Sequence, residues 1–171
     1  MAGAKPVRRA PRRASHSKNP RYTVDASVFV NAFNPYEEGH TESLLLLSEI
    51  EDRGDPVIVP MLLLPEIAAA VARASDDGAG ALELANATAA LPHLTVVPLT
   101  PVLAKQAAEL AATHRLRATD AMYVAVARRY GTTIVSRDDE QRTRGAAVVS
   151  CQTPEETLQS GLGLAEPAKS G

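Results

Sequence analysis

Four carboxylic acids of this sequence stand where a strand or a helix is expected to begin or end: Asp25, Glu66, Asp120 and Asp138. If the fold brings them together, something must offset their mutual repulsion. No His or Cys accompanies the four acids, so a metal ion would have oxygen ligands only. Oxygen ligands select hard divalent cations such as Mg²⁺ or Mn²⁺. Such an ion polarises a phosphodiester and lowers the pKa of an attacking water, which a neighbouring carboxylate can orient or deprotonate. The four acids therefore predict phosphate chemistry at a metal site.

Each acid also has an ordinary structural interpretation that the sequence leaves open. Asp25 directly precedes an apolar helical segment and has the residue type of a helix N-cap. Asp120 suits the first turn of a helix, where the dipole favours a negative charge, and Asp138 suits a turn after a strand. Glu66 is the one acid in an otherwise apolar stretch over 61–72. Its charge is either exposed in a first helical turn, or buried at a cost of several kcal/mol unless it is paired or metal-bound.

The elements that must position these acids alternate between short β-branched runs and apolar helical stretches. We expect strands over residues 21–24, 56–60, 94–98, 132–136 and 146–150. We expect helices over residues 26–33, 40–53, 61–74, 79–91, 101–114, 120–130 and 153–159. This alternation predicts an α/β sandwich, in which a parallel sheet is covered by helices on both faces. Ligands of such sheets bind beyond the carboxyl ends of the strands, where Asp25 and Asp138 lie.

Local signals accompany two of these helices. Gly54 is a typical C-cap for the helix over 40–53. Thr153, with Glu156 three residues later, has the form of a capping box at the start of the last helix. The apolar pattern of the helix over 40–53 predicts a core face made of Leu44, Leu45, Leu47, Ser48 and Ile50.

Composition narrows the class of protein. At 171 residues, with 45% hydrophobic and 22% charged residues, the chain has the profile of one soluble globular domain. An aromatic share of 4% without Trp argues against a base-stacking platform for RNA. The single cysteine, Cys151, has no partner for a disulfide or a thiolate metal site, which fits the reducing cytoplasm. No membrane span is expected, because Pro92, Pro98 and Pro101 interrupt the uncharged stretch over 84–104.

The net charge of −2 is unevenly distributed along the chain. Residues 1–21 hold seven of the 18 Lys and Arg and no acid, which leaves 11 basic against 20 acidic residues in the rest. We expect a disordered basic arm over 1–20, a domain over 21–160 and a flexible tail over 161–171. The arm either binds phosphates by charge, with a strong salt dependence, or is a solvated tail.

The segments around the four acids resemble the PIN-domain family, in particular its VapC-type toxin ribonucleases. These segments are VDASV at Asp25, LLPEIA at Glu66, ATDAMYVAVA at Asp120 and IVSRD at Asp138, and the resemblance covers about residues 21–150. It implies a PIN-like three-layer sandwich with a central parallel five-stranded sheet covered by helices. It also implies a metal-dependent endoribonuclease that uses Mg²⁺ or Mn²⁺ to hydrolyse phosphodiester bonds of single-stranded RNA.

The resemblance also assigns roles to single residues. Asp25 and Asp120 match the principal metal-binding acids of the family. Glu66 and Asp138 complete the acidic pocket and help to position the metal or a water, so all four are candidate catalytic residues. Ser136, two residues before Asp138, matches a small hydroxyl residue of the family and could contact a phosphate or a water.

Partners follow from the same resemblance. It implies a homodimer and, for toxin members, an antitoxin that buries a segment in the active-site groove. Arginines that flank Asp120 and Asp138 could offset RNA phosphates or could lie on solvated helix faces. The role of Asp139, next to Asp138, stays open. Two rival functions also stay open: a non-catalytic PIN-fold module that binds RNA or a protein, and a metal-dependent phosphatase on a similar sheet.

Overall fold

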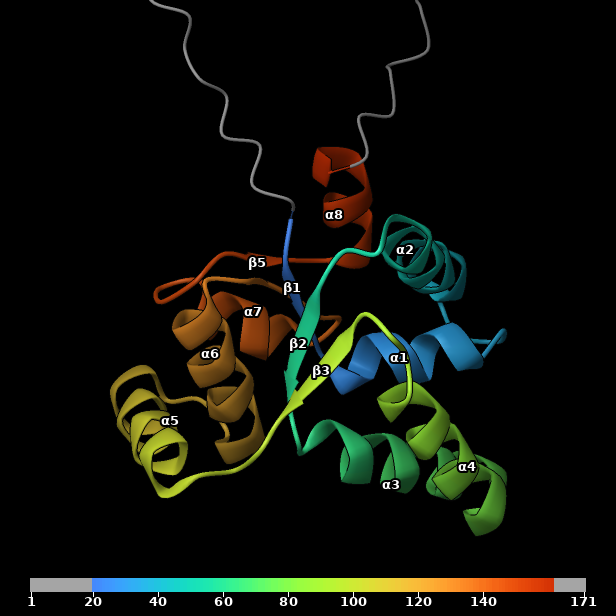
Figure 1. Cartoon of the computed structure of the whole chain (residues 1–171), viewed down its shortest axis with the longest axis horizontal. Coiled ribbons are helices and arrows are strands. Elements are labelled where there is room, and N and C mark those ends of the chain that lie inside the picture. Colours follow the sequence, from blue (N-terminus) through green and yellow to red (C-terminus); the bar gives the residue numbers. More distant parts are fainter. Residues whose placement is uncertain (1–19, 162–171) are drawn as a thin grey trace, which may run out of the picture.

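The computed structural model describes residues 20–161, so the predicted basic arm up to residue 19 and the predicted tail from residue 162 lie outside the described residues. Five parallel strands form one sheet in the order β3-β2-β1-β4-β5. The strands are β1 Tyr22–Val24, β2 Val57–Pro60, β3 Leu94–Val97, β4 Thr133–Val135 and β5 Cys151–Gln152. The predicted parallel five-stranded sheet is thus confirmed, and the first strand of the chain lies at its centre (Figure 1).

Helices cover both faces of this sheet. The helices are α1 Ala26–Phe33, α2 His40–Arg53, α3 Leu63–Ser75, α4 Gly78–Ala89, α5 Pro101–His114, α6 Ala118–Tyr130, α7 Asp139–Gly145 and α8 Pro154–Gly161. Helices α5, α6 and α7 lie on one side of the sheet, and α1 to α4 lie on the other (Figure 1). The predicted three-layer sandwich is therefore confirmed. None of the helices within residues 20–161 has the length and apolar character needed to cross a membrane.

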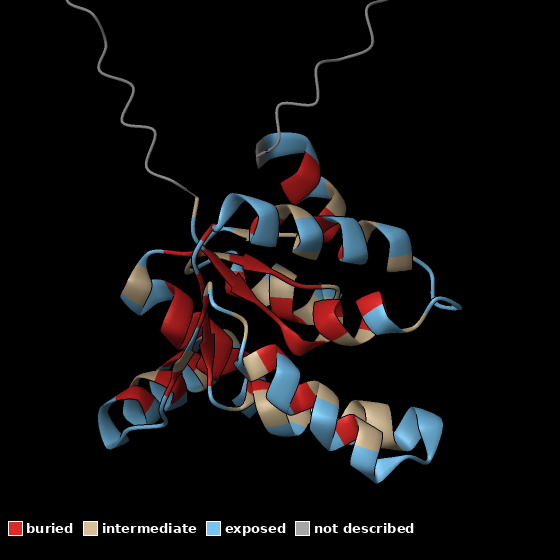
Figure 2. Cartoon of the chain, turned by 45° about the vertical axis from the view of Figure 1, so that its right-hand side comes forward, coloured by how far each residue is buried: buried red, intermediate tan, exposed pale blue. Residues whose placement is uncertain are grey.

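The central strands are short and buried on both faces, as parallel strands under two helical layers are. All three residues of β1 and all four residues of β2 are buried (Figure 2). The hydroxyl of Thr23 donates to the carbonyl oxygen of Ile58 at 2.8 Å and shares a 2.6 Å hydrogen bond with the hydroxyl of Thr132. The one polar side chain of β1 is therefore satisfied in the interior of the sheet.

Two hydrophobic cores hold the layers together. The core beneath α1 to α4 includes Val24, Val59 and Ile67, and the core beneath α5 and α6 includes Leu103 and Ile134. Each fully buried aliphatic side chain contributes roughly 1.5 to 3 kcal/mol by leaving water. This packing and the pairing of β1 with β4 fix the carboxyl ends of the two strands next to each other.

The predicted core face of α2 is only partly confirmed. Ile50 is buried and Leu47 packs partly buried against the core, as predicted, whereas Leu44, Leu45 and Ser48 are exposed. The residues that α2 buries are Ser43, Leu46 and Ile50. Leu44 and Leu45 are 49% and 47% exposed. Four consecutive leucines give no helical periodicity of their own, so the packing against α1 and α8 decides how the helix is rotated.

The prediction of a fifth strand over residues 146–150 is also wrong. An unpredicted helix, α7, ends at Gly145, the chain then turns, and β5 forms only at Cys151–Gln152. Val148 and Val149 pack partly buried against the core beneath α6. Their β-branched pattern therefore reflects burial within a turn, which sequence periodicity does not distinguish from burial within a strand.

Two predicted helix ends are confirmed. Gly54 ends α2 in a left-handed conformation with a φ of 63°, which a glycine adopts without strain. At the start of α8, the N–H of Thr153 donates to the carboxylate of Glu156 at 2.8 Å, and the N–H of Glu156 donates to the hydroxyl of Thr153 at 3.1 Å. This reciprocal pair is the predicted capping box.

Candidate active site

A cleft of about 790 Å³ opens beyond the carboxyl ends of β1 and β4, with α1, α3 and α6 around it. Its lining includes all four predicted acids: Asp25, Glu66, Asp120 and Asp138. They come from four different elements, at the start of α1, in α3, in α6 and at the start of α7. The structure therefore brings together acids that lie up to 113 positions apart in the sequence.

Asp25 is both the N-cap of α1 and part of the cleft wall. Its Oδ1 accepts a hydrogen bond from the N–H of Ser27 at 2.9 Å, and its Oδ2 accepts one from the side-chain amide of Gln141 at 3.2 Å. Burial raises the pKa of Asp25, and the charge of Asp138 raises it further, while the hydrogen bonds from Ser27 and Gln141 lower it. Capping the helix and lining the cleft are therefore compatible roles for this residue.

Asp120 lies in the first turn of α6 and is 7% exposed. Its Oδ2 has no hydrogen-bond partner within residues 20–161. Burial, followed by the charges of Asp138 and Asp25, raises the pKa of Asp120 to about 6, against a lowering by Arg117. A buried carboxylate oxygen without a partner, close to two other carboxylates, favours a proton or a cation at this point of the cleft.

Glu66 is anchored in the cleft by a buried tyrosine. The hydroxyl of Tyr123 donates a 2.6 Å hydrogen bond to Oε2 of Glu66. Tyr123 is fully buried in α6, three residues after Asp120, so both residues lie on one face of that helix. Burial raises the pKa of Glu66, the hydrogen bond from Tyr123 lowers it, and the charges of Asp25 and Asp120 raise it. Glu66 is therefore not the freely exposed residue of the competing interpretation.

Asp138 caps α7 and pairs with an arginine. Its Oδ1 accepts a hydrogen bond from the N–H of Gln141 at 2.9 Å, and its Oδ2 accepts one from the guanidinium of Arg117 at 3.0 Å. Ser136 is fully buried and outside the cleft lining, and its hydroxyl accepts the N–H of Asp138 at 3.0 Å. Ser136 thus orients Asp138, and its contact with a phosphate or a water stays a prediction. Asp139 is exposed and also lies outside the cleft lining.

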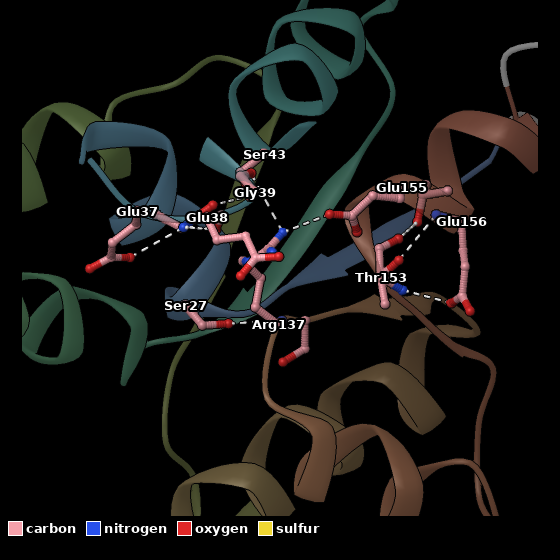
Figure 3. A network of polar contacts seen from close by, with 12 residues as sticks. Ser27, Glu37, Glu38, Gly39, Ser43, Arg137, Thr153, Glu155 and Glu156 are labelled. Atoms are coloured by element: carbon pink, nitrogen blue, oxygen red, sulfur yellow. Dashed lines mark hydrogen bonds and ion pairs between the residues drawn. The ribbon is translucent and has the colours of Figure 1, made fainter. Parts of the chain in front are cut away.

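Three arginines, Arg73, Arg117 and Arg137, line the same cleft. The N–H of Arg137 donates to the hydroxyl of Ser27 at 3.1 Å, and its guanidinium forms a 3.0 Å ion pair with Glu155 of α8 (Figure 3). Arg73, in the last turn of α3, is exposed and forms no ion pair in the described part of the chain. The cleft therefore combines carboxylates with cationic side chains, an arrangement suited to a phosphate ester next to a metal ion.

Three residues that shape the cleft were not predicted from the sequence: Tyr123, Gln141 and Arg73. A signal for Tyr123 exists, because helical spacing places it on the face of Asp120. The contact between Gln141 and Asp25 joins positions 116 residues apart, and no local pattern indicates it. Arg73 lies seven residues, or two helical turns, after Glu66 in α3. The predicted helix over 61–74 already implied that the two residues share a face.

The donor set of the cleft fits a divalent cation. No three His, Cys, Asp or Glu side chains of residues 20–161 stand close enough to form a complete set of metal ligands. However, Mg²⁺ is usually bound by one or two carboxylates and completes its coordination with waters and substrate phosphates. The unpartnered Oδ2 of Asp120 and the remaining lone pairs of Asp25 supply that number of carboxylates. The acids present therefore suit Mg²⁺ or Mn²⁺ without a closed cage of protein ligands.

Comparison with models of known families identifies the domain. The model of the PIN domain matches residues 22–146, a range that contains all four acids. This chain belongs to the PIN domain family. The resemblance seen in the sequence is thus confirmed, and the match runs from β1 through α7, so that β5 and α8 follow it.

Several solved structures share the fold of this PIN domain. VapC20 of Mycobacterium tuberculosis, a sarcin-ricin loop cleaving toxin, is 23% identical with a TM-score of 0.62, and the match covers 73% of this chain and 95% of VapC20. VapBC2 of Rickettsia felis, bound to a promoter DNA fragment, gives 13% identity and a TM-score of 0.58 over 78% and 98% of the two chains. A toxin–antitoxin complex from Klebsiella pneumoniae gives 15% identity and a TM-score of 0.55 over 79% and 97%. A search of curated proteins finds no match.

Proposed function

We propose that this PIN domain is a metal-dependent endoribonuclease that hydrolyses phosphodiester bonds of single-stranded RNA. The observation that carries the proposal is the convergence of four carboxylates from separate elements on one cleft. Asp25, Glu66 and Asp120 have raised pKa values, so ionising them in their buried positions costs free energy. A divalent cation offsets this cost, which supports a metal-assisted reaction on a phosphate ester.

The four acids take different roles in this proposal. Asp25 and Asp120 are the acids that we assign to Mg²⁺ or Mn²⁺. When bound, such an ion supplies charge to neutralise the phosphodiester and lowers the pKa of a water. Glu66 is held at one oxygen by Tyr123, and its other oxygen orients a water or accepts its proton, for which a raised pKa is suitable. Asp138 is fixed by its cap and its ion pair and completes the negative potential of the cleft.

The arginines of the cleft bind phosphates of the RNA backbone other than the one at the cleaved bond. Arg117 and Arg137 already form ion pairs within the chain, so their positions are set before any ligand binds. Arg73 has no ion pair within the described residues and is therefore the side chain most available to an RNA phosphate. Contacts of this kind position a nucleic acid without reading its bases.

We further propose that the protein is the toxin of a type II toxin–antitoxin pair. It acts in the cytoplasm as a homodimer. An antitoxin inhibits it by placing a segment in the cleft. The support is the shared fold with VapC20, a toxin, and with the Klebsiella pneumoniae toxin–antitoxin complex. Light scattering of the purified chain tests the homodimer, for which a mass of twice 18.1 kDa is expected. A mass of 18.1 kDa at micromolar concentration would contradict it.

The nuclease is tested by cleavage of a mixed-sequence single-stranded RNA with Mg²⁺, with Mn²⁺ and with EDTA. We expect Asp25→Asn and Asp120→Asn each to reduce cleavage by about 100-fold or more, the scale of a lost general base or metal ligand. Asp139→Asn, an acid outside the cleft lining, is the matched control and should keep full activity. Undiminished cleavage in both cleft variants would refute the assignment. A wild-type chain that neither cleaves RNA nor binds Mg²⁺ in calorimetry would instead point to a non-catalytic binding module.

A further inference from the structure

Gln141 is a fully buried glutamine of α7 that contacts two of the four acids. Its backbone N–H donates a 2.9 Å hydrogen bond to Oδ1 of Asp138. Its side-chain amide donates a 3.2 Å hydrogen bond to Oδ2 of Asp25. Through these two donors one residue connects the end of β1 to the start of α7.

Packing alone would not select a glutamine at this position. The side-chain oxygen of Gln141, Oε1, is buried and has no hydrogen-bond partner within residues 20–161. An unsatisfied buried acceptor destabilises the folded state, whereas an unbranched apolar side chain of similar size would fill the same space without that penalty. The favourable contribution of Gln141 therefore comes from its amide donor, which faces Asp25.

The hydrogen bond from Gln141 orients the carboxylate of Asp25 without neutralising it. Oδ1 of Asp25 is held by the N–H of Ser27 and Oδ2 by the amide, so the plane of the carboxylate is fixed at both oxygens. An ionised carboxylate has about four acceptor positions, so about two remain for a ligand in the cleft. A Lys or Arg in place of Gln141 would form an ion pair with Asp25 and compete with a cation for it.

The other acids of the cleft show the same distinction between neutral and charged donors. Glu66 is held by a neutral hydroxyl, that of Tyr123, which does not offset its charge. Asp138 is held by the guanidinium of Arg117, which offsets its charge. Asp25 and Glu66 are therefore fixed in place by neutral donors, whereas the charge of Asp138 is partly offset by Arg117.

We propose that Gln141 is a positioning residue that orients the carboxylate of Asp25 for binding a divalent cation. This inference rests on the proposed function, because Asp25 binds a cation only if the cleft is a metal site. Gln141 is not part of the cleft lining, so it does not touch a bound RNA. Loss of its amide therefore lowers the affinity for the cation and the kcat of cleavage, and leaves the KM for RNA nearly unchanged.

The test uses Gln141→Met in the full chain, with Gln141→Leu as a second variant of the same kind, because the two apolar side chains differ in shape. Calorimetry with Mn²⁺ should show an affinity at least about 10-fold below that of the wild type, the usual effect of removing a hydrogen-bond partner of a metal ligand. Thr132→Val removes the buried hydrogen bond between Thr132, just before β4, and Thr23 of β1, but Thr132 lies outside the cleft lining, so this variant should bind Mn²⁺ like the wild type. Thermal unfolding in EDTA checks that each variant is folded.

The outcomes separate the two proposals. A folded Gln141→Met or Gln141→Leu variant with Mn²⁺ affinity and kcat within twofold of the wild type would overturn the role of Gln141 while leaving the nuclease intact. An equal loss of Mn²⁺ affinity in Thr132→Val would also overturn it, since the effect would then be one of general stability. A wild-type chain that neither binds Mn²⁺ nor cleaves RNA would overturn the proposed function and this role together.

Discussion

Asp120→Asn should make the metal-free protein more stable at neutral pH while removing its activity. The pKa of Asp120 is raised from the ordinary value of 3.8 to about 6, chiefly because the carboxyl is buried and then because Asp138 and Asp25 are close. The folded state therefore binds the proton of Asp120 more tightly than the unfolded state does. This contribution to stability is complete below about pH 4 and is lost as the pH rises through about 6.

The size of the effect follows from the pKa difference. A change of one pKa unit corresponds to about 1.4 kcal/mol, so a rise from 3.8 to about 6 corresponds to at most about 3 kcal/mol. Because the cleft is open to solvent, screening reduces this cost. Because an asparagine resembles the protonated carboxyl, we expect Asp120→Asn to raise the free energy of unfolding by about 1 to 3 kcal/mol at pH 8 and by about a third of that at pH 4.5.

Urea unfolding in EDTA between pH 4.5 and pH 8 measures this difference. The wild type should lose stability across the range relative to Asp120→Asn, and Asp139→Asn, whose carboxyl is exposed outside the cleft lining, should follow the wild type. Adding Mg²⁺ at pH 8 should stabilise the wild type but not Asp120→Asn, since only the former has the complete carboxylate pair. An Asp120→Asn variant that is no more stable than the wild type at pH 8 would show that the buried charge is not costly, and the reasoning would fail.

Two further variants test the surroundings of the acids. Tyr123→Phe removes the donor to Glu66 and should reduce the free energy of unfolding by about 1.5 kcal/mol in urea, the low end for a hydrogen bond to a charged group, because Glu66 is only half-buried. It should also lower kcat for RNA, and an unchanged kcat would show that the position of Glu66 does not matter. Arg73→Ala, measured for RNA binding in the Asp25→Asn background, should weaken binding and reduce the slope of log affinity against log salt by about 1. Arg128→Ala, an exposed arginine outside the cleft lining, should leave the slope unchanged, and an equal change in both would contradict a phosphate contact at Arg73.

The sequence was sufficient for features whose physical cause is local. The β-branched runs of β1 and β2, the left-handed Gly54 and the reciprocal cap of Thr153 and Glu156 each depend on neighbouring residues, and each was predicted. The expected parallel sheet placed Asp25 and Asp138 at one edge, but the grouping of all four acids was supported only by the resemblance to a family, because no local signal shows that distant carboxylates meet.

Features that depend on packing between distant segments could not be predicted in this way. The rotation of α2 depends on its packing against α1 and α8, and a run of leucines fits more than one rotation. The start of β5 depends on pairing with Ile134, and the preceding valines look equally suited to a strand. The two donors that hold Asp25 and Glu66, namely Gln141 and Tyr123, belong to segments 116 and 57 residues away from their acceptors.

Because β1 lies at the centre of the sheet, two of the four acids come from the first half of the chain and two from the second. The first half folds outward from β1 through β2 to β3 and carries Asp25 and Glu66, while the second half adds β4 and β5 on the other side and carries Asp120 and Asp138. A nascent chain therefore has no complete centre until α7 has left the ribosome. The exposed link over residues 98–100 is accordingly a place at which the gene could be split into two fragments that each lack two of the four acids. If the proposed cleavage depends on all four acids, association of the fragments should restore it only when both sides of β1 are paired.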